Sequence, residues 1–230
     1  MDTIVAKQPV VPLPSSHVDS QSKELYERLT PLLGLLASGT EDNYIGENVS
    51  QLEHALQAAH FGAQQSCSSD AFILACLLHD IRHRLPLYPP KDFDPWGAQD
   101  KKESEDDSSR FMGEYGIAGH EMIGASYLLH LGFSQQVADM VAAHVAVKRY
   151  LCSVNPQYHA KLSFASQKTL EYQGGPMSAQ EVEAFERDPL KEQKIQLRLC
   201  DELAKEVDFK VDGLEKYVGM MIDHLKEQKK

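Results

Sequence analysis

The chain has 230 residues and a mass of 25.7 kDa, which suffices for one large domain or two small ones with a real hydrophobic core. Hydrophobic residues make up 42% and charged residues 25%, an ordinary globular composition that excludes collagen-like or disordered character for most of the chain. Thirty-four acidic residues against 23 Lys and Arg give a net charge of −11, which would repel a phosphate backbone, so no nucleic-acid partner is expected.

Residues 1–19 are expected to form an irregular N-terminal arm, because Pro9, Pro12 and Pro14 interrupt any helical ladder. Beyond the arm, apolar residues recur with a period close to 3.6 and no alternating strand-like run appears, so residues 20–230 are predicted to form a single all-α domain. The expected helices cover 21–38 with a bend at Pro31, 44–66, 70–83, 119–131, 135–151, 162–172, 179–187, 189–206 and 213–228.

Polar caps and one proline mark several helix starts. They are Ser69 or Asp70, Ser134, the capping box of Ser178 with Glu181, and Asp188 with Pro189 at the first helical position. The segment 84–117 has no helical period, because it holds four prolines and the acidic run 103–107. Loops of this length are usually functional or disordered, so a long excursion from the helical bundle is expected here.

The four cysteines, Cys67, Cys76, Cys152 and Cys200, show no CxxC spacing, and no segment like a secretory signal precedes them. Reduced thiols in a cytoplasmic protein are therefore expected. The most apolar stretch, 71–78, is far shorter than the roughly 20 residues that a helix needs to cross a bilayer. No membrane span is predicted.

Four of the ten histidines lie in apolar helical segments: His54, His79, His120 and His144. Each of them alone is more often a hydrogen-bonded core residue than a ligand. The adjacent pair His79-Asp80 is the strongest signal, because neighbouring side chains diverge by about 100° around a helix and can hold two sides of an ion, or two ions.

The order His54, His79-Asp80, His120, His144, Asp201 resembles the HD-domain superfamily, with two histidines more than its minimal metal set. The resemblance implies an HD-domain helical bundle with additional C-terminal helices. Neutral imidazoles and carboxylates suit iron or manganese, and six ligands are too many for one ion that keeps open positions. A dinuclear centre bridged by Asp80 is therefore expected.

Two cations and a row of hydroxyl and amide groups predict an anionic substrate. Lys148 lies four residues after His144, and Arg198 lies three before Asp201, so each cation shares a helical face with a proposed ligand. Ser166, Thr169 and Gln173 recur with helical spacing and offer donors to the oxygens of a phosphate-like group. The alternative for these three residues is a solvated helix face.

Four motifs resemble the mixed-valent di-iron HD oxygenases of phosphonate breakdown. They are YIGE at 44–47, QLEH at 51–54, HVAVKRYL at 144–151 and KTLEYQGGPM at 168–177, within a match that runs from about residue 40 to 225. The resemblance implies an Fe(II)/Fe(III) pair, a small organophosphonate and O2 as substrates, and oxidative cleavage of the C–P bond, which offers no good leaving group to hydrolysis. Iron supplies redox chemistry that side chains lack.

The same resemblance implies a role for each matching residue. His54, His79, Asp80, His120, His144 and Asp201 would hold the irons, and Lys148, Ser166, Thr169 and Arg198 would bind the phosphonate. Gln173 is added to them from its helical spacing. His83 would lie over the substrate near its C1 hydroxyl, Glu47 would face the substrate ammonium, and Tyr44 would act as a mobile gate over an iron. The simpler alternatives are a helix-start acid for Glu47 and a core aromatic for Tyr44.

The excursion 84–117 is compatible with two methylation states of the substrate's amine. It is longer than expected for an enzyme whose substrate carries a free amine, and it holds five aromatic residues: Tyr88, Phe93, Trp96, Phe111 and Tyr115. Aromatic rings beside Glu47 could form a cage for a trimethylammonium group, or they could simply anchor a surface loop. The expected products are phosphate with glycine, or with glycine betaine if the amine is trimethylated.

Three other readings of the ligand set remain. An HD phosphohydrolase would use the same ligands and cations to activate water on a phosphate ester, but it has no use for the motif at 44–47. A signalling or scaffold HD protein usually loses ligands, whereas all six positions are filled here. Myo-inositol oxygenase shares the ligand order but is not expected to combine it with Lys148, Ser166, Thr169 and Arg198.

Overall fold

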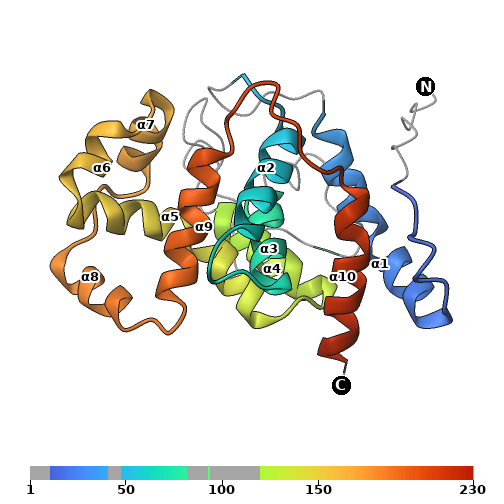
Figure 1. The fold of residues 1–230 in the computed structure, drawn as a ribbon. Helices are drawn as coiled ribbons and strands as arrows, with labels where there is room; N and C mark the ends of the chain where they lie inside the picture. Colours follow the sequence, from blue (N-terminus) through green and yellow to red (C-terminus); the bar gives the residue numbers. More distant parts are fainter. Residues whose placement is uncertain (1–10, 41–47, 82–92, 94–119, 230) are drawn as a thin grey trace, which may run out of the picture.

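The computed structural model describes residues 11–40, 48–81, 93 and 120–229. These residues form ten α-helices, which confirms the all-α prediction (Figure 1). The helices are α1 (Ser20–Ser38), α2 (Gln51–Ala63), α3 (Asp70–Leu78), α4 (His120–Leu131), α5 (Gln135–Val154), α6 (Pro156–Lys161), α7 (Phe164–Tyr172), α8 (Ala179–Glu186), α9 (Lys191–Leu203) and α10 (Glu215–Gln228).

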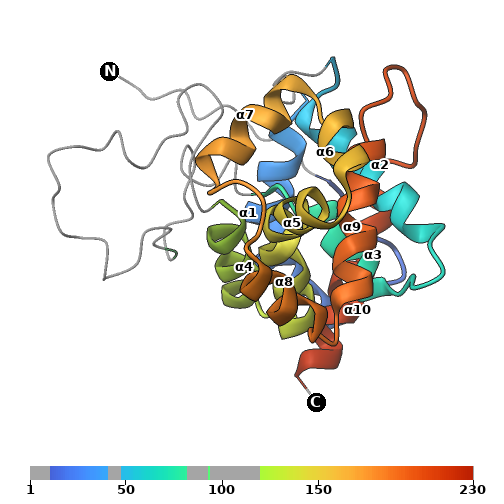
Figure 2. The same cartoon turned by 90° about the vertical axis from the view of Figure 1, so that its left-hand side faces the viewer.

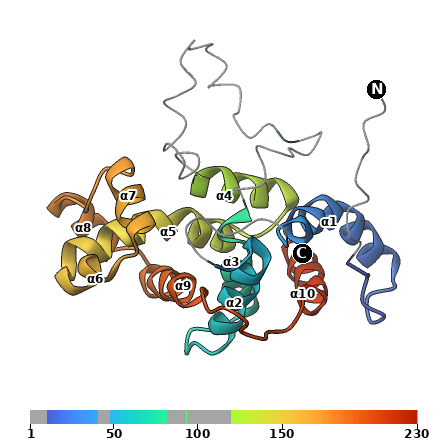
Figure 3. The ribbon, with the colours of Figure 1, turned by 90° about the horizontal axis from the view of Figure 1, so that it is seen from above.

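Helix α3 lies at the centre of the bundle and packs against α2, α5, α9 and α10. The views from the front and from above agree that α2 and α3 are in the middle, with α1 and α10 on one side and α9 on the other (Figures 1 and 3). The small helices α6–α8 gather at the far end, and Figure 2 shows them in front of α5 and α9. The helices α2, α5 and α9, which carry predicted ligands, therefore meet in the interior with α3, which directly precedes two more.

The sequence of α3 explains its central place. Its mean hydropathy is high and it is apolar on nearly every face, which is typical of a helix surrounded by protein. Phe72, Leu74, Cys76 and Leu78 are all fully buried. Ser69 caps the helix by accepting a hydrogen bond from the backbone N–H of Phe72, as expected. The helix therefore delivers its last residues into the core.

Two predicted boundaries near the ligands were wrong. The helix expected over 44–66 spans only Gln51–Ala63, because Ser50 and Glu53 form a capping box that starts it at Gln51. The helix expected over 70–83 ends at Leu78, and His79 and Asp80 lie in the turn that follows. The turn, and not a continuing helix, sets the direction of these two side chains.

The C-terminal half contains a helix that the sequence pattern did not reveal. The predicted helix over 135–151 continues to Val154, and α6 follows it, with Asn155 accepting hydrogen bonds from the backbone N–H groups of Gln157 and Tyr158. The caps at Ser134 and at Ser178 with Glu181 are confirmed.

The predicted start of the next helix was wrong. Asp188 accepts from the backbone N–H of Leu190, Pro189 lies in a turn, and α9 begins only at Lys191.

Of the predicted N-terminal arm, residues 1–10 lie outside the described residues, and residues 11–19 form no helix or strand. The Tyr26 hydroxyl donates to the carbonyl oxygen of Val11, which attaches this part of the arm to α1. Of the excursion 84–117, only Phe93 lies within the described residues, and its ring packs 4.9 Å from that of Tyr127. Tyr88, Trp96, Phe111 and Tyr115 lie outside them. No helix in the described part of the chain is long and apolar enough to cross a membrane.

Candidate metal centre and anion site

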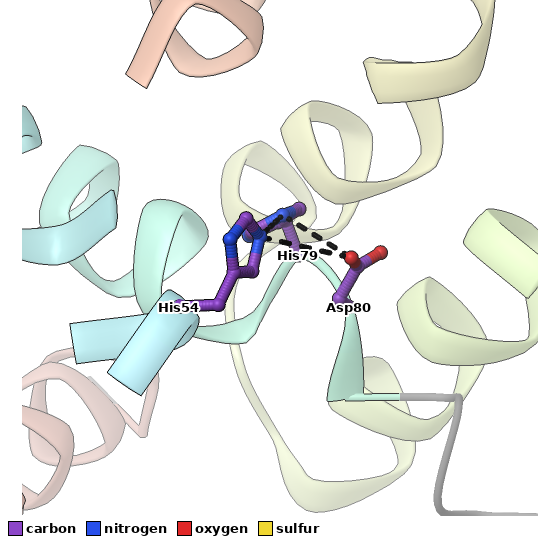
Figure 4. Close-up of side chains that lie close together, drawn as sticks. All are labelled: His54, His79 and Asp80. Carbon is purple, nitrogen blue, oxygen red and sulfur yellow. Dashed lines mark hydrogen bonds and ion pairs between the residues drawn. The ribbon is translucent and has the colours of Figure 1, made fainter. Parts of the chain in front are cut away.

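The bundle brings five of the predicted ligands together in its interior. His54 comes from α2, and His79 and Asp80 follow α3 (Figure 4). His144 comes from α5 and Asp201 from α9. His54, His79, His144 and Asp201 expose 3% or less of their surface, and Asp80 exposes 10% of its side chain. Charged and polar groups this deeply buried require partners.

Each of the three described histidines of the candidate metal site is oriented by a backbone carbonyl. In all three, the ring Nδ1 lies 2.8–2.9 Å from a carbonyl oxygen: His54 from Ala204, His79 from Cys76 and His144 from Val141. A carbonyl only accepts, so Nδ1 must carry the proton and donate it. The neutral ring then presents an unprotonated Nε2, which is the form that binds a metal ion.

The Nε2 atoms of His54 and His79 face each other at 3.1 Å. The Asp80 Oδ2 atom lies 3.9 Å and 3.5 Å from them, and the Asp201 Oδ1 atom lies 3.5 Å and 3.7 Å from them. Two imidazole nitrogens and two carboxylate oxygens thus surround one small space. When both rings are neutral, none of these four atoms carries a hydrogen to donate. Such an arrangement is repulsive unless a proton or a metal cation occupies it, and its mixture of imidazole and carboxylate donors suits a transition metal.

The second oxygen of Asp80 faces a different ligand. Its Oδ1 atom lies 3.5 Å from Nε2 of His144, whose ring centroid is 5.5 Å from that of His79. One carboxylate therefore presents one oxygen to His54 and His79 and the other oxygen to His144. This is the geometry in which a carboxylate can bridge two ions.

The pKa values agree with a site that attracts positive charge. Burial lowers the pKa of His54 and of His144 to about 4, so both rings stay neutral and available as ligands. Burial also acts to lower the pKa of His79, but the Asp80 and Asp201 carboxylates outweigh it and raise that pKa to about 9. In the metal-free chain, a proton on His79 takes the place of a cation.

The predicted cations lie beside this centre. Arg198 is 6% exposed, and its Nη1 donates to Oδ2 of Asp201 over 2.6 Å. Lys148 is 4% exposed, and its Nζ donates to Oγ1 of Thr169 over 2.8 Å. Burial, and then repulsion by Arg198, lower the pKa of Lys148 to about 7. Two buried cations beside a hydroxyl group form a suitable site for a small anion.

The motif at 168–177 holds α7 against α5. Gly174 and Gly175 have positive φ angles of 91° and 72°, which favour glycine, and they turn the chain after α7. The Arg149 side chain donates from Nε to the Gly175 carbonyl oxygen over 2.8 Å, and the Ser153 hydroxyl donates to that of Met177 over 2.9 Å. These bonds fix the helix that carries Thr169 beside the helix that carries Lys148.

The other predicted substrate-binding residues of α7 differ from Thr169. The Ser166 hydroxyl accepts a hydrogen bond from the Ser163 hydroxyl at the start of the helix. Gln173 ends the helix, and its buried Oε1 has no hydrogen-bond partner among the residues that the structure describes. Tyr44, Glu47 and His83 lie outside the described residues, as does the side chain of His120, whose backbone begins α4. Their roles stay predictions.

A pocket reaches Asp80 from the side of α1, α2 and α3. It has about 310 Å³ of free space, which includes part of its open mouth. Its described lining is mostly apolar and consists of Leu35, Leu36, Gly39, Gln51, Ala55, Leu77, Asp80 and Ile81. Asp80 thus meets open space on one side and imidazoles on the other.

Sequence reasoning missed two residues that bind Arg198. Glu202 lies four residues after Arg198 on α9, a spacing that could have indicated an ion pair. Tyr158 lies on α6, where the sequence carries no local signal of the contact. Both residues contact Arg198, although nothing in the neighbouring sequence marks them as part of the anion site.

Anion affinity is expected to fall as the pH rises through about 7, because Lys148 then loses its proton and its attraction for the anion. Sulfate, whose own charge is constant in this range, should bind at least about fivefold more tightly at pH 6 than at pH 8.5 when measured by calorimetry. Lys148→Met should flatten the profile, whereas Lys194→Met, which removes a buried lysine paired with Asp188, should leave it unchanged. A wild-type profile in Lys148→Met would contradict the assignment.

No protein-family profile matches the chain. Among curated proteins, it is 38% identical over 198 residues to the hydroxymethylphosphonate dioxygenase of Gimesia maris, covering 86% of this chain and 88% of that protein. It is 36% identical over 175 residues to the [1-hydroxy-2-(trimethylamino)ethyl]phosphonate dioxygenase (glycine-betaine-forming) of Leisingera caerulea, covering 76% and 79%. An uncharacterized protein of Acanthamoeba polyphaga mimivirus is 32% identical over 209 residues, covering 91% and 87%.

Proposed function

Because this chain belongs to the phosphonate dioxygenase family, we propose that it uses two iron ions and O2 to cleave the C–P bond of a 1-hydroxy-2-aminoethylphosphonate-type substrate, with a free or an N-trimethylated amine. As a member of that family it is an O2-dependent oxidoreductase that acts on phosphonates. The products of the proposed reaction are phosphate and glycine, or phosphate and glycine betaine. The atoms balance for one O2 per substrate, with each product gaining one oxygen atom.

The observation that carries the proposal is the position of Asp80 between two sets of imidazoles. His54, His79 and Asp201 would hold one iron together with Oδ2 of Asp80, and His144 would hold the other with Oδ1. The predicted ligand His120 would complete the second position. When bound, a mixed-valent Fe(II)/Fe(III) pair would supply the redox chemistry with O2 that no side chain provides. The order of these ligands along the helices supports an HD-domain architecture.

The chain's own residues would bind and orient the substrate. Lys148, Thr169 and Arg198 lie next to the ligand cluster and would hold the phosphonate oxygens, so that the C1 carbon points toward the metals. Ser166 and Gln173 would add donors from the same helix as Thr169. The amide nitrogen of Gln173 would be the donor, because its buried Oε1, unpaired among the described residues, can only accept a hydrogen bond.

The hydroxyl and amine groups of the substrate would be recognised by predicted residues that lie outside the described part of the chain. Glu47 would face the ammonium group, His83 would lie near the C1 hydroxyl, and Tyr44 would cover an iron until substrate arrives. The names of two relatives bear on the tail, since one acts on hydroxymethylphosphonate and the other on a trimethylamino compound. The amine of the proposed substrate is therefore either free or trimethylated.

The test is phosphate release from a panel of 1-hydroxyphosphonates with an amino tail, a trimethylammonio tail or no tail, in the presence and absence of O2. Release should require O2 and be fastest with one of the two nitrogen-bearing substrates, and the iron-loaded protein should hold about two irons per chain. Equal release without O2, or hydrolysis of phosphate esters instead, would point to an HD phosphohydrolase and contradict the proposal. Fastest release without a tail would overturn the substrate assignment alone.

A further inference from the structure

The guanidinium group of Arg198 is held on several sides. Its Nε donates to the Tyr158 hydroxyl over 3.1 Å and to Oε1 of Glu202 over 3.0 Å. Its Nη2 lies 3.0 Å from the same Glu202 oxygen, and its Nη1 donates to Asp201. The Tyr158 hydroxyl in turn donates to Glu202. A closed ring of hydrogen bonds thus joins α6 to α9 around one buried cation.

The charges explain why Arg198 needs this support. Arg198 and Lys148 are two buried cations that repel each other, and Asp201 directs its Oδ1 atom toward the metal site. Asp201 therefore cannot balance Arg198 alone. Glu202 supplies a carboxylate that forms no hydrogen bond or ion pair with the described candidate metal ligands, and its side chain is 28% exposed. An arginine paired in this way stays in one position, because its fork is rigid.

The contacts of Arg198 also leave donors for a ligand. A guanidinium has five N–H bonds. Nε and one N–H of Nη1 donate hydrogen bonds, and Nη2 forms an ion pair with Glu202. At least one N–H on Nη1 and one on Nη2 therefore have no hydrogen-bond partner within the described part of the chain. They lie on adjacent nitrogens, which is the arrangement that binds two oxygens of a tetrahedral anion.

We propose that Glu202 and Tyr158 are positioning residues that fix the Arg198 guanidinium, so that its two remaining N–H bonds point at the phosphonate. This inference rests on the proposed function, because it takes Arg198 as a phosphonate-binding residue. The role of the short helix α6 would then be to place Tyr158 beside Arg198. Preorganising a binding group in this way improves affinity without any contact between the positioning residues and the ligand.

The experiment measures methylphosphonate binding by calorimetry on the iron-loaded protein, with iron content and melting temperature determined for each variant. Glu202→Gln keeps the shape of the side chain and removes its charge, and it should weaken binding about tenfold. Tyr158→Phe removes one hydroxyl and should weaken binding about threefold. The double variant should lose less than the product of the two factors, because both residues act on the same group.

A matched control is Glu192→Gln, on an exposed glutamate of the same helix that bonds to Gln196 and should leave binding unchanged. In turnover, Glu202→Gln should raise KM with little change in kcat, which separates positioning from a loss of folding. Unchanged affinity in both variants, or a loss that follows iron content or melting temperature, would overturn the inference. Failure of the wild-type protein to bind methylphosphonate would instead contradict the proposed function.

Discussion

Replacing Asp80 by asparagine is expected to lower O2-dependent phosphate release by more than about 100-fold, the upper limit for losing a partner that merely supports a metal ligand. The reason is that its two carboxylate oxygens face two different imidazole sets, so one substitution affects both proposed metal positions. Asparagine keeps the size of the side chain but replaces one oxygen with an NH2 group, which only donates hydrogen bonds and cannot bind a metal ion. The measurements are turnover and iron content per chain.

The matched control is Asp212→Asn, which changes an exposed aspartate paired with Lys216 and should leave both quantities unchanged. In Asp80→Asn, iron content should fall from about two per chain to about one or less. Full iron content with full turnover would show that Asp80 does not bridge two ions. Full iron content with lost turnover would restrict its role to a step after metal binding.

The largest effect on stability is expected from Leu74→Ala. Leu74 is fully buried in α3, and α3 packs against α2, α5, α9 and α10, so the cavity cannot close without moving the helices that carry the ligands. The free energy of unfolding should fall by about 2–5 kcal/mol. The melting temperature should fall by about 4–20 °C for a chain of this size.

Urea denaturation of the metal-free protein measures this loss without any contribution from a bound metal. Leu129→Ala is the control, because this leucine on α4 is 40% exposed and its truncation should change the free energy of unfolding by about 0.5 kcal/mol or less. If the two variants lost equal stability, α3 would not be the centre of the core.

The sequence alone sufficed for the helical class, and it also named the five described candidate ligands that the structure brings together. Helical periodicity and caps such as Ser69 and Ser134 are encoded by residues close in the chain. His54, His79 and His144 were recognisable because polar residues in apolar helices are unusual, and their order matched a known arrangement. The fold then brought them together with Asp80 and Asp201, which no spacing could establish.

The features that sequence reasoning missed depend on contacts between distant segments. Tyr158 meets Arg198 across 40 positions of the chain, on a helix of six residues that is too short to show a period. The turn that holds His79 was read as helix because the apolar run of α3 continues up to it. The start of α9 was misplaced because Asp188 bonds to Leu190 inside a turn, a local competitor of helix capping.

The carbonyl groups that orient the imidazoles have a consequence for how the protein acquires its metal. Because Ala204, Cys76 and Val141 fix the rings in the folded chain, the donor atoms are in place before any ion arrives. A preformed set of nitrogen and oxygen ligands binds divalent ions according to their intrinsic affinity, and zinc and copper bind more tightly than ferrous iron. Loading of the proposed iron pair would therefore depend on the supply of iron during synthesis, and protein produced in a zinc-rich medium is expected to carry zinc instead.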